Sequence, residues 1–277
     1  MAVTLALCSA LAYGVCDFLG GLLSRRASAW QVAIMVQTSS AAFTWLAVLV
    51  TVGQPTREQL LVGALAGVAN GMGTAFLYRG FARGRMGVVA PVSALGSALV
   101  PLVVGLAQGD EPSRLASLGV VCALPAIWLI ARPAEHDHAD GPSGLGDALL
   151  AGLGFGVFFG AIGQVPDDAG FTPLALCQTV SIAGVVGAAL LARERDWRPR
   201  GRAALSAAAL GPLGLTATAT FMIATQHGML SLVSVIAALY PASTVLLAWL
   251  VLKERIGPAQ AVGLAAAAVA VSLVALG

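Results

Sequence analysis

The sequence predicts an all-α integral membrane protein with ten transmembrane helices in two inverted five-helix repeats. Of its 277 residues, 58% are hydrophobic and only 10% are charged, whereas a soluble domain carries about 25% charged residues. So few charges cannot cover the surface of a folded protein of this length in water. The apolar residues also fall into ten segments, and the two halves of the chain share features at a nearly constant separation.

Polar breaks that contain charged residues, proline or glycine separate the ten apolar segments. Crossing hydrocarbon takes about 20 apolar residues in a helix. An open strand would leave its amides unpaired in lipid, and the segments do not alternate as barrel strands do. The expected helices cover residues 3–23, 30–52, 59–78, 86–107, 114–131, 145–164, 172–192, 203–225, 230–252 and 257–276.

Internal matches indicate a duplication. Gln37 and Gln178 occupy equivalent places at a separation of 141 residues, and Asp110 and Glu254 do so at a separation of 144. A nearly constant offset of this kind is typical of a repeat. We expect a first repeat over residues 1–131, a polar linker over 132–147 and a second repeat over 148–277.

The loop charges predict that the second repeat is inverted. Five helices is an odd number, so a duplicated unit enters the membrane the second time from the opposite side. In the expected arrangement, 13 of the 15 Lys and Arg residues fall in the odd-numbered loops. Basic residues concentrate on the cytoplasmic side, so the loop charges place both termini outside.

Composition limits the partners. A net charge of +2 with no basic run between aromatic residues does not indicate nucleic acid. Acidic and histidine residues between Glu135 and Asp140 lie consecutively in the Gly/Pro-rich linker, where no fixed ligand geometry is expected. We therefore expect no metal site and no cofactor. The expected partners are the lipid bilayer and a small-molecule substrate, and both a monomer and a homodimer stay open.

The ninth and tenth segments carry the motifs of a known family. Residues 231–244 hold a mid-span proline, Pro241, then Glu254 follows in a short turn, and Gln260 and Gly263 stand on the last helix. This pattern resembles the drug/metabolite transporter (DMT) superfamily with its EamA-like repeats, over nearly the whole chain. The resemblance implies ten-helix carriers that export or exchange small metabolites, amino acids or drugs through a central cavity.

Two features depart from that family. Arg25 and Arg26 stand at the end of the first helix, where a lysine is common, and family members usually have cytoplasmic termini, contrary to the loop charges here.

Asp17 is the most informative single residue. It lies about four residues past the middle of the first expected helix, where an acidic side chain costs about 2.5–3.5 kcal/mol on the translocon scale. Such a residue usually faces a cavity or a partner. Its expected roles are proton coupling or substrate binding. The alternatives are an ion pair with Arg79 or with another arginine near a helix end, or an interfacial position.

Further substrate-binding candidates are polar or aromatic side chains within the spans. Hinge candidates are prolines within the fourth and ninth spans, because a proline removes a helical hydrogen bond. Threonines in such helices usually bond their own backbone or a neighbouring helix, so amides are the stronger candidates. The binding candidates are Tyr13, Gln37, Asn70, Thr74, Gln178, Thr216, Thr220 and Tyr240; the hinge candidates are Pro91, Pro101 and Pro241.

These observations predict a secondary transporter rather than an enzyme. It would move a small organic metabolite, amino acid or drug across the cytoplasmic (inner) membrane by alternating access, as an exporter with proton exchange. The alternative is a membrane-embedded enzyme acting on a lipid-linked substrate, which would need a cluster of Asp, His or Glu near the interface.

Overall fold

The computed structural model describes residues 1–24, 26–83, 86–131, 144–253 and 255–277, and its regular elements there are all helical. The α-helices are α1 (Ala2–Ser24), α2 (Ala29–Val50), α3 (Arg57–Arg83), α4 (Met86–Ala107), α5 (Arg114–Ile130), α6 (Leu145–Ile162), α7 (Thr172–Leu191), α8 (Gly201–Ser206), α9 (Gly211–Gln226), α10 (Leu230–Ala237), α11 (Tyr240–Leu252) and α12 (Pro258–Leu276). Two short 3-10 helices, η1 (Asp167–Ala169) and η2 (Ala207–Leu210), join them.

Length and composition make this a multi-pass membrane protein. Eight stretches of the described residues are long and apolar enough to cross a bilayer, and two shorter apolar helices cover Val92–Ala107 and Arg114–Ile130. Large apolar side chains such as Leu65, Val103 and Leu149 are more than half exposed. An outward apolar surface of this kind needs lipid around it.

Two expected helices are broken. The segment predicted at 203–225 consists of α8, η2 and α9, and the segment predicted at 230–252 consists of α10 and α11. Pro241 has no N–H to donate to the preceding turn, and the Ala242 N–H bonds the Leu239 carbonyl at 2.9 Å instead of continuing the α10 ladder. The kink expected at Pro241 is therefore an interruption of the helix.

The fourth span differs from the ninth. Helix α4 runs without a break from Met86 to Ala107, and both Pro91 and Pro101 lie within it. Pro101 is buried, while the side chain of Pro91 lies outside the described residues. Of the three hinge candidates, only Pro241 stands beside a break in the described helices.

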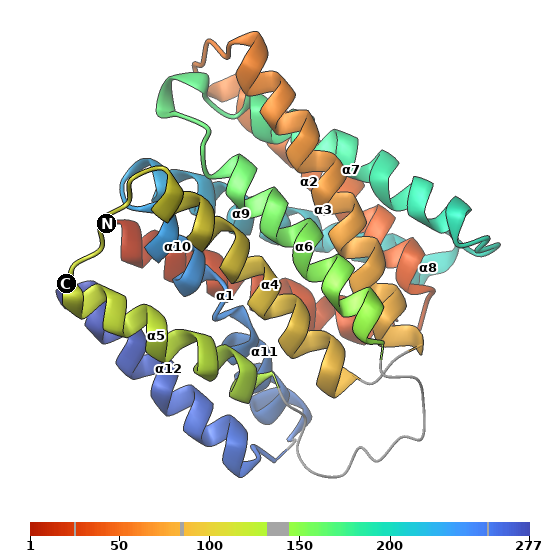
Figure 1. Cartoon of the computed structure of the whole chain (residues 1–277). Coiled ribbons are helices and arrows are strands. Elements are labelled where there is room, and N and C mark those ends of the chain that lie inside the picture. Colours follow the sequence, from red (N-terminus) through yellow and green to blue (C-terminus); the bar gives the residue numbers. More distant parts are fainter. Residues whose placement is uncertain (25, 84–85, 132–143, 254) are drawn as a thin grey trace.

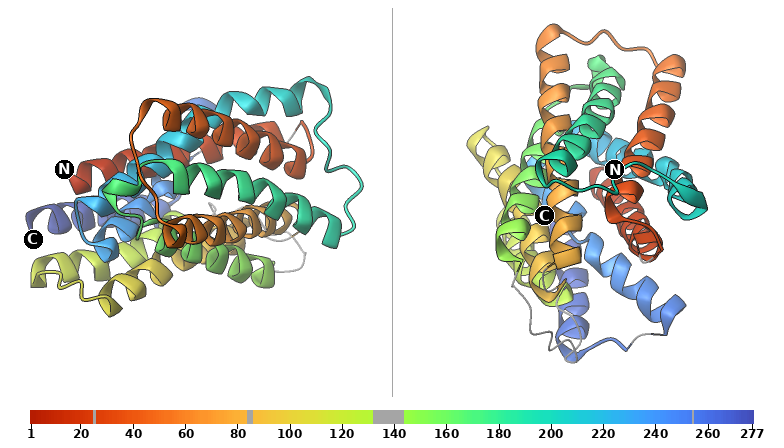
Figure 2. Two further views of the ribbon diagram at one scale, coloured as in Figure 1. Left: turned by 90° about the horizontal axis from the view of Figure 1, so that it is seen from above. Right: turned by 90° about the vertical axis from the view of Figure 1, so that its right-hand side faces the viewer.

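Helices from the two halves of the chain alternate in the bundle. Helix α3 packs on α6 and α7, α4 on α6 and α10, α1 on α9 and α11, and α5 on α12. Both termini lie at the same end of the bundle (Figures 1 and 2). The loops α2–α3, α4–α5, α6–α7 and α9–α10 belong to this end, which we call the terminal end; the opposite end is the basic end.

A stripe of glycines brings α3 into backbone contact with α7. A Cβ on Gly67 would lie 2.8 Å from Val180 Cβ and closer still to the Cys177 carbonyl oxygen. A Cβ on Gly63 or Gly71 would similarly meet the α7 backbone. Small residues at this four-residue spacing let the two helix backbones pack closely, as is common in membranes.

Candidate functional site

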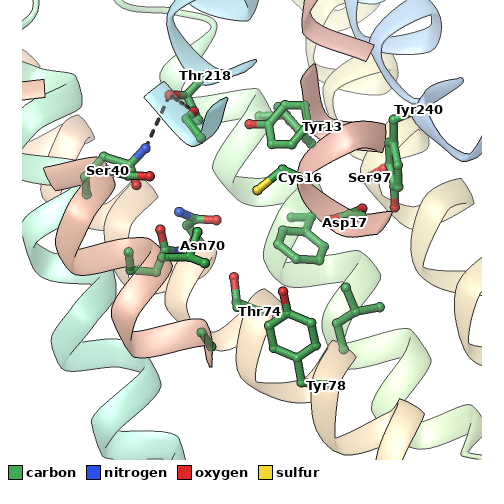
Figure 3. Close-up of a pocket in the computed structure, with 18 residues that line it drawn as sticks. Tyr13, Cys16, Asp17, Ser40, Asn70, Thr74, Tyr78, Ser97, Thr218 and Tyr240 are labelled. Atoms are coloured by element: carbon green, nitrogen blue, oxygen red, sulfur yellow. Dashed lines mark hydrogen bonds between the residues drawn. The ribbon is translucent and has the colours of Figure 1, made fainter. Parts of the chain in front are cut away.

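A pocket lies between the helices near the middle of the bundle (Figure 3). Its empty volume, counted with its open solvent-filled part, is about 760 Å³. Helices α1, α2, α3, α4, α6, α7, α9 and α11 all contribute to its wall. The described lining residues are Tyr13, Cys16, Asp17, Ala33, Val36, Gln37, Ser40, Asn70, Thr74, Leu77, Tyr78, Ser97, Phe155, Phe159, Gln178, Gly214, Thr218 and Tyr240.

The pocket occupies the middle of the bundle and its basic half. Cys16 and Asp17 stand in the second half of α1, and Leu77 and Tyr78 stand near the end of α3, both of which run towards the basic end. The terminal half is filled instead by buried apolar side chains, among them Ile162, Phe221 and Ile236. The described packing is therefore closed on the terminal side of the pocket.

Contacts between loops hold the terminal end together. The Ser231 backbone N–H at the start of α10 donates to Asp110 Oδ2 at 2.8 Å. A carboxylate is favoured at this place because a helix N-terminus carries partial positive charge. Gln108 Nε2 also donates to Gln164 Oε1 at 2.6 Å. Both bonds join the first half of the chain to the second.

Asp17 lies in the pocket wall among tyrosines. Figure 3 shows its carboxyl beside Tyr240, and Tyr13 and Tyr78 line the same pocket. These are all three tyrosines of the chain, and they come from α1, α3 and α11. The tertiary fold thus gathers the phenol rings around one carboxyl group.

Arg79 does not pair with Asp17. Its Nε donates to Asp147 Oδ1 at 3.0 Å, and its guanidinium lies over the Phe76 ring, 4.7 Å from the centroid. Asp147 is in the first turn of α6, so this ion pair joins α3 to the start of the second half. The structural alternative that assigned Arg79 to Asp17 is therefore wrong for the described conformation.

The three amide candidates share the pocket. Gln178 Nε2 donates to Thr218 Oγ1 at 3.3 Å, while Gln178 Oε1 is buried and has no hydrogen-bond partner among the described residues. Gln37 and Asn70 are each 7% exposed. Buried polar atoms are normally paired, so Gln178 Oε1 is an acceptor available to a ligand or a water molecule.

Aromatic rings close one wall of the pocket. The Tyr13 ring meets Phe159 edge-on, with centroids 5.6 Å apart, and lies 6.3 Å from the Tyr240 ring. The Tyr240 hydroxyl is hydrogen-bonded to Ser93. The Tyr13 hydroxyl, by contrast, is buried without a partner among the described residues. It is a second polar group left available at the site.

Seven of the nine binding candidates line this pocket, and two do not. Thr74 stands one turn after Asn70 on α3, as its spacing predicts, and both line the wall. Thr216 and Thr220 instead donate to the carbonyls of Pro212 and Thr216 on their own helix, at 2.8 and 2.6 Å.

Several residues that line the pocket were not among the binding candidates predicted from the sequence. Ser40 follows Gln37 by one turn, and Thr218 stands between the two rejected threonines. Helical spacing from Gln37 could have found Ser40. Phe155, Phe159, Ser97 and Cys16 carry no comparable signal, because apolar and small residues occur all round these helices.

The prediction that the chain holds no metal site can be compared with the structure only for the described residues. The described residues hold no group of three or more His, Cys, Asp or Glu side chains that could bind a metal ion. Glu135–Asp140 and Glu254 lie outside the described residues.

Replacing Tyr13 by phenylalanine is expected to separate binding from folding. The lost hydroxyl has no hydrogen-bond partner in the described parts of the chain, so the free energy of unfolding should change by less than about 1 kcal/mol. A hydrogen bond to the substrate would be lost, and transport should fall about 10-fold. Thr216→Val is the control, because it removes a hydroxyl that bonds the Pro212 carbonyl and lies outside the described pocket wall. Transport and unfolding assays on both variants measure this; unchanged transport in Tyr13→Phe would show that the hydroxyl does not contact the substrate.

Solved structures share this fold. A known crystal structure superposes with a TM-score of 0.77 at 16% sequence identity, over 99% of this chain and 96% of that one. It is one of 17 solved chains that match. At this identity, the likeness shows the fold alone. No curated protein matches the sequence.

The second half of the chain matches a described family. Residues 143–276 match the EamA-like transporter family, so the resemblance predicted from the motifs of the ninth and tenth segments is confirmed. This match includes α6 to α12, which contribute Phe155, Phe159, Gln178, Thr218 and Tyr240 to the pocket. The chain thus carries an EamA-like transporter domain, as a membrane transporter of the DMT type does.

Proposed function

We propose that this chain is a secondary transporter that moves a small organic solute across the cytoplasmic membrane by alternating access, exporting it in exchange for protons. The observation that carries the proposal is a pocket at mid-bundle whose wall includes a carboxyl group, amides and hydroxyls. Packed apolar side chains fill the bundle on the terminal side of this pocket. A carrier working by alternating access needs a central site that communicates with one side at a time.

The packing supports inverted repeats over residues 1–131 and 148–277. If α1 to α5 correspond in order to the five spans of the second half, the contact between α3 and α7 is equivalent to the contact between α2 and α9. In the same way, the contact of α4 with α6 is equivalent to that of α1 with α10 and α11. The contact between α5 and α12 is equivalent to itself. Two equivalent halves related by a two-fold axis would produce this exchange of contacts, and five spans in each half would give the halves opposite orientations.

Loop charge supports an orientation for the described conformation. The pocket lies towards the basic end, which holds Arg26, Arg79 and the arginines between α7 and α8. Basic loops are retained in the cytoplasm, so we assign this conformation as open to the cytoplasm and closed outside. The substrate would then reach Asp17 and the tyrosines of the pocket from the cytoplasm, as an exporter requires.

Asp17 is the group proposed to exchange protons. It is the only lining residue of the described set with an acidic or basic side chain, and one carboxyl that alternates between protonated and ionised forms can couple two fluxes. Broken helices at α10–α11 place the backbone interruption beside Tyr240, next to this carboxyl. Pro241 is proposed as the hinge there, because its missing N–H already breaks the helix.

Flux in proteoliposomes tests the proposal. Purified protein should accelerate efflux of panel solutes against an imposed pH gradient, and collapse of the gradient with an ionophore should stop accumulation. Liposomes without protein are the control. Absence of flux for every solute would contradict transport, and flux that ignores the pH gradient would contradict proton exchange alone.

A further inference from the structure

The chemistry of the pocket wall selects the charge of its ligand. Among the described lining residues, Asp17 is the only acidic group and no Lys, Arg or His is present. The nearest base on α3, Arg79, is engaged by Asp147 and by the Phe76 ring. An anionic ligand would face an uncompensated carboxylate without a cationic partner, in a site where charge interactions are strong. The wall therefore favours a cation.

The aromatic residues favour the same choice. Tyr13, Tyr78 and Tyr240 line the same pocket as Asp17, and Phe159 meets the Tyr13 ring edge-on. The faces of aromatic rings attract a desolvated cation through the ring quadrupole. Their apolar area also suits a hydrophobic body attached to the cationic head.

Two polar groups without hydrogen-bond partners among the described residues narrow the chemistry of the ligand further. Gln178 Oε1 and the Tyr13 hydroxyl are buried, line the pocket and lack partners among the described residues. Gln178 is 1% exposed, and its amide nitrogen is held by Thr218, which leaves the oxygen as an acceptor. An acceptor that lines the same pocket as a carboxylate fits a ligand with N–H donors rather than a fully methylated one.

We propose that the substrate of this site is a protonated primary or secondary amine on an aromatic or apolar body, held by Asp17, the tyrosines and Gln178. The proposal rests on the transport function proposed above and narrows its solute. It excludes carboxylates and zwitterionic amino acids as preferred substrates, because the described wall offers no cationic group to their carboxylates.

Binding to the purified full chain in lipid nanodiscs tests the ligand class by titration calorimetry. The probes share one phenethyl body: 2-phenylethylammonium, its N,N,N-trimethyl derivative, phenylalanine, 3-phenylpropionate and 2-phenylethanol. The primary ammonium should bind at least about 10-fold tighter than phenylalanine or phenylpropionate. The trimethyl derivative should bind about 3-fold more weakly than the parent, because it cannot donate to Gln178.

A matched pair of variants tests the assigned contact. Asp17→Asn should reduce binding of the ammonium to that of 2-phenylethanol, while Glu58→Gln, at an exposed position in the first turn of α3, should leave it unchanged. The proposal is overturned by equal or tighter binding of phenylalanine, phenylpropionate or the trimethyl derivative, by no ammonium binding up to about 10 mM, or by an unaffected Asp17→Asn.

Flux of the same probes separates this proposal from the proposed function. Ammonium binding without flux in proteoliposomes would retain the ligand class and contradict transport. Flux of phenylalanine or phenylpropionate in preference to the ammonium would retain transport and overturn the ligand class.

Discussion

Asp17→Asn is expected to lower pH-gradient-driven transport by at least about 100-fold, the loss typical when a buried charge is removed from a binding contact. Asparagine keeps the size and polarity of the side chain but cannot release a proton. Asp17 is the only acidic or basic residue among the described lining residues, so no neighbour in that set can replace it as a proton carrier.

Folding should survive this substitution. Asp17 makes no ion pair among the described residues, and an amide is less costly than a carboxylate in an apolar span. The free energy of unfolding should therefore stay within about 1 kcal/mol of the parent value. Flux into liposomes with an imposed pH gradient gives the activity, and thermal unfolding in detergent gives the stability.

Glu58→Gln is the matched control for charge, because Glu58 is exposed and distant from the pocket wall. It should transport at the parent rate. Driven transport by Asp17→Asn at the parent rate would contradict the proton-carrier assignment. Loss of driven transport with retained counterflow of substrate would place the defect in proton exchange rather than in substrate binding.

The fold was largely predictable because hydrocarbon penalises polar residues sharply. Each charged break costs enough to end a span. Eight of the ten predicted segments therefore match stretches long and apolar enough to cross a bilayer, and the other two match shorter apolar helices among the described residues. The breaks inside the eighth and ninth spans were less visible. Pro241 marked a kink, but the full interruption before Tyr240 depends on packing against α1, where a Cβ on Gly14 would lie 2.6 Å from the Tyr240 carbonyl oxygen.

The site was predictable where a polar residue is rare in its span and ambiguous where polar residues alternate. Asp17 and Asn70 stand out among apolar neighbours, and both line the pocket. Thr216, Thr218 and Thr220 do not differ in composition, and only the rotation of α9 decides that Thr218 faces Gln178. Sequence spacing gives a helix face, but which face points inwards depends on contacts between distant segments.

Gly67→Leu is expected to cause the largest loss of stability, about 3 kcal/mol, the upper end for an overpacked interior. The new side chain would collide with the Cys177 carbonyl oxygen and with Val180 Cβ. A flexible side chain could rotate away, but a backbone carbonyl moves only if α3 and α7 separate.

Separating α3 from α7 is costly because lipid supplies no hydrophobic force that would hold the helices together without close contact. Association of α3 with α7 depends on close van der Waals contact, and a gap of about 0.5–1 Å already forfeits a quarter to a half of each contact. Gly63 and Gly71 would lose their contacts with α7 together with Gly67, since all three lie on the same stripe.

Gly187→Leu is the matched control, because Gly187 lies in α7 and a Cβ there meets nothing within 4 Å. Thermal unfolding in detergent should show a midpoint about 6–12 °C lower for Gly67→Leu and a nearly unchanged midpoint for Gly187→Leu. Replacing glycine by leucine gains about 1 kcal/mol of helix propensity in both variants, so their difference isolates the contact. Equal midpoints would contradict a backbone-to-backbone interface between α3 and α7, the helices that carry Asn70 and Gln178 in the pocket wall.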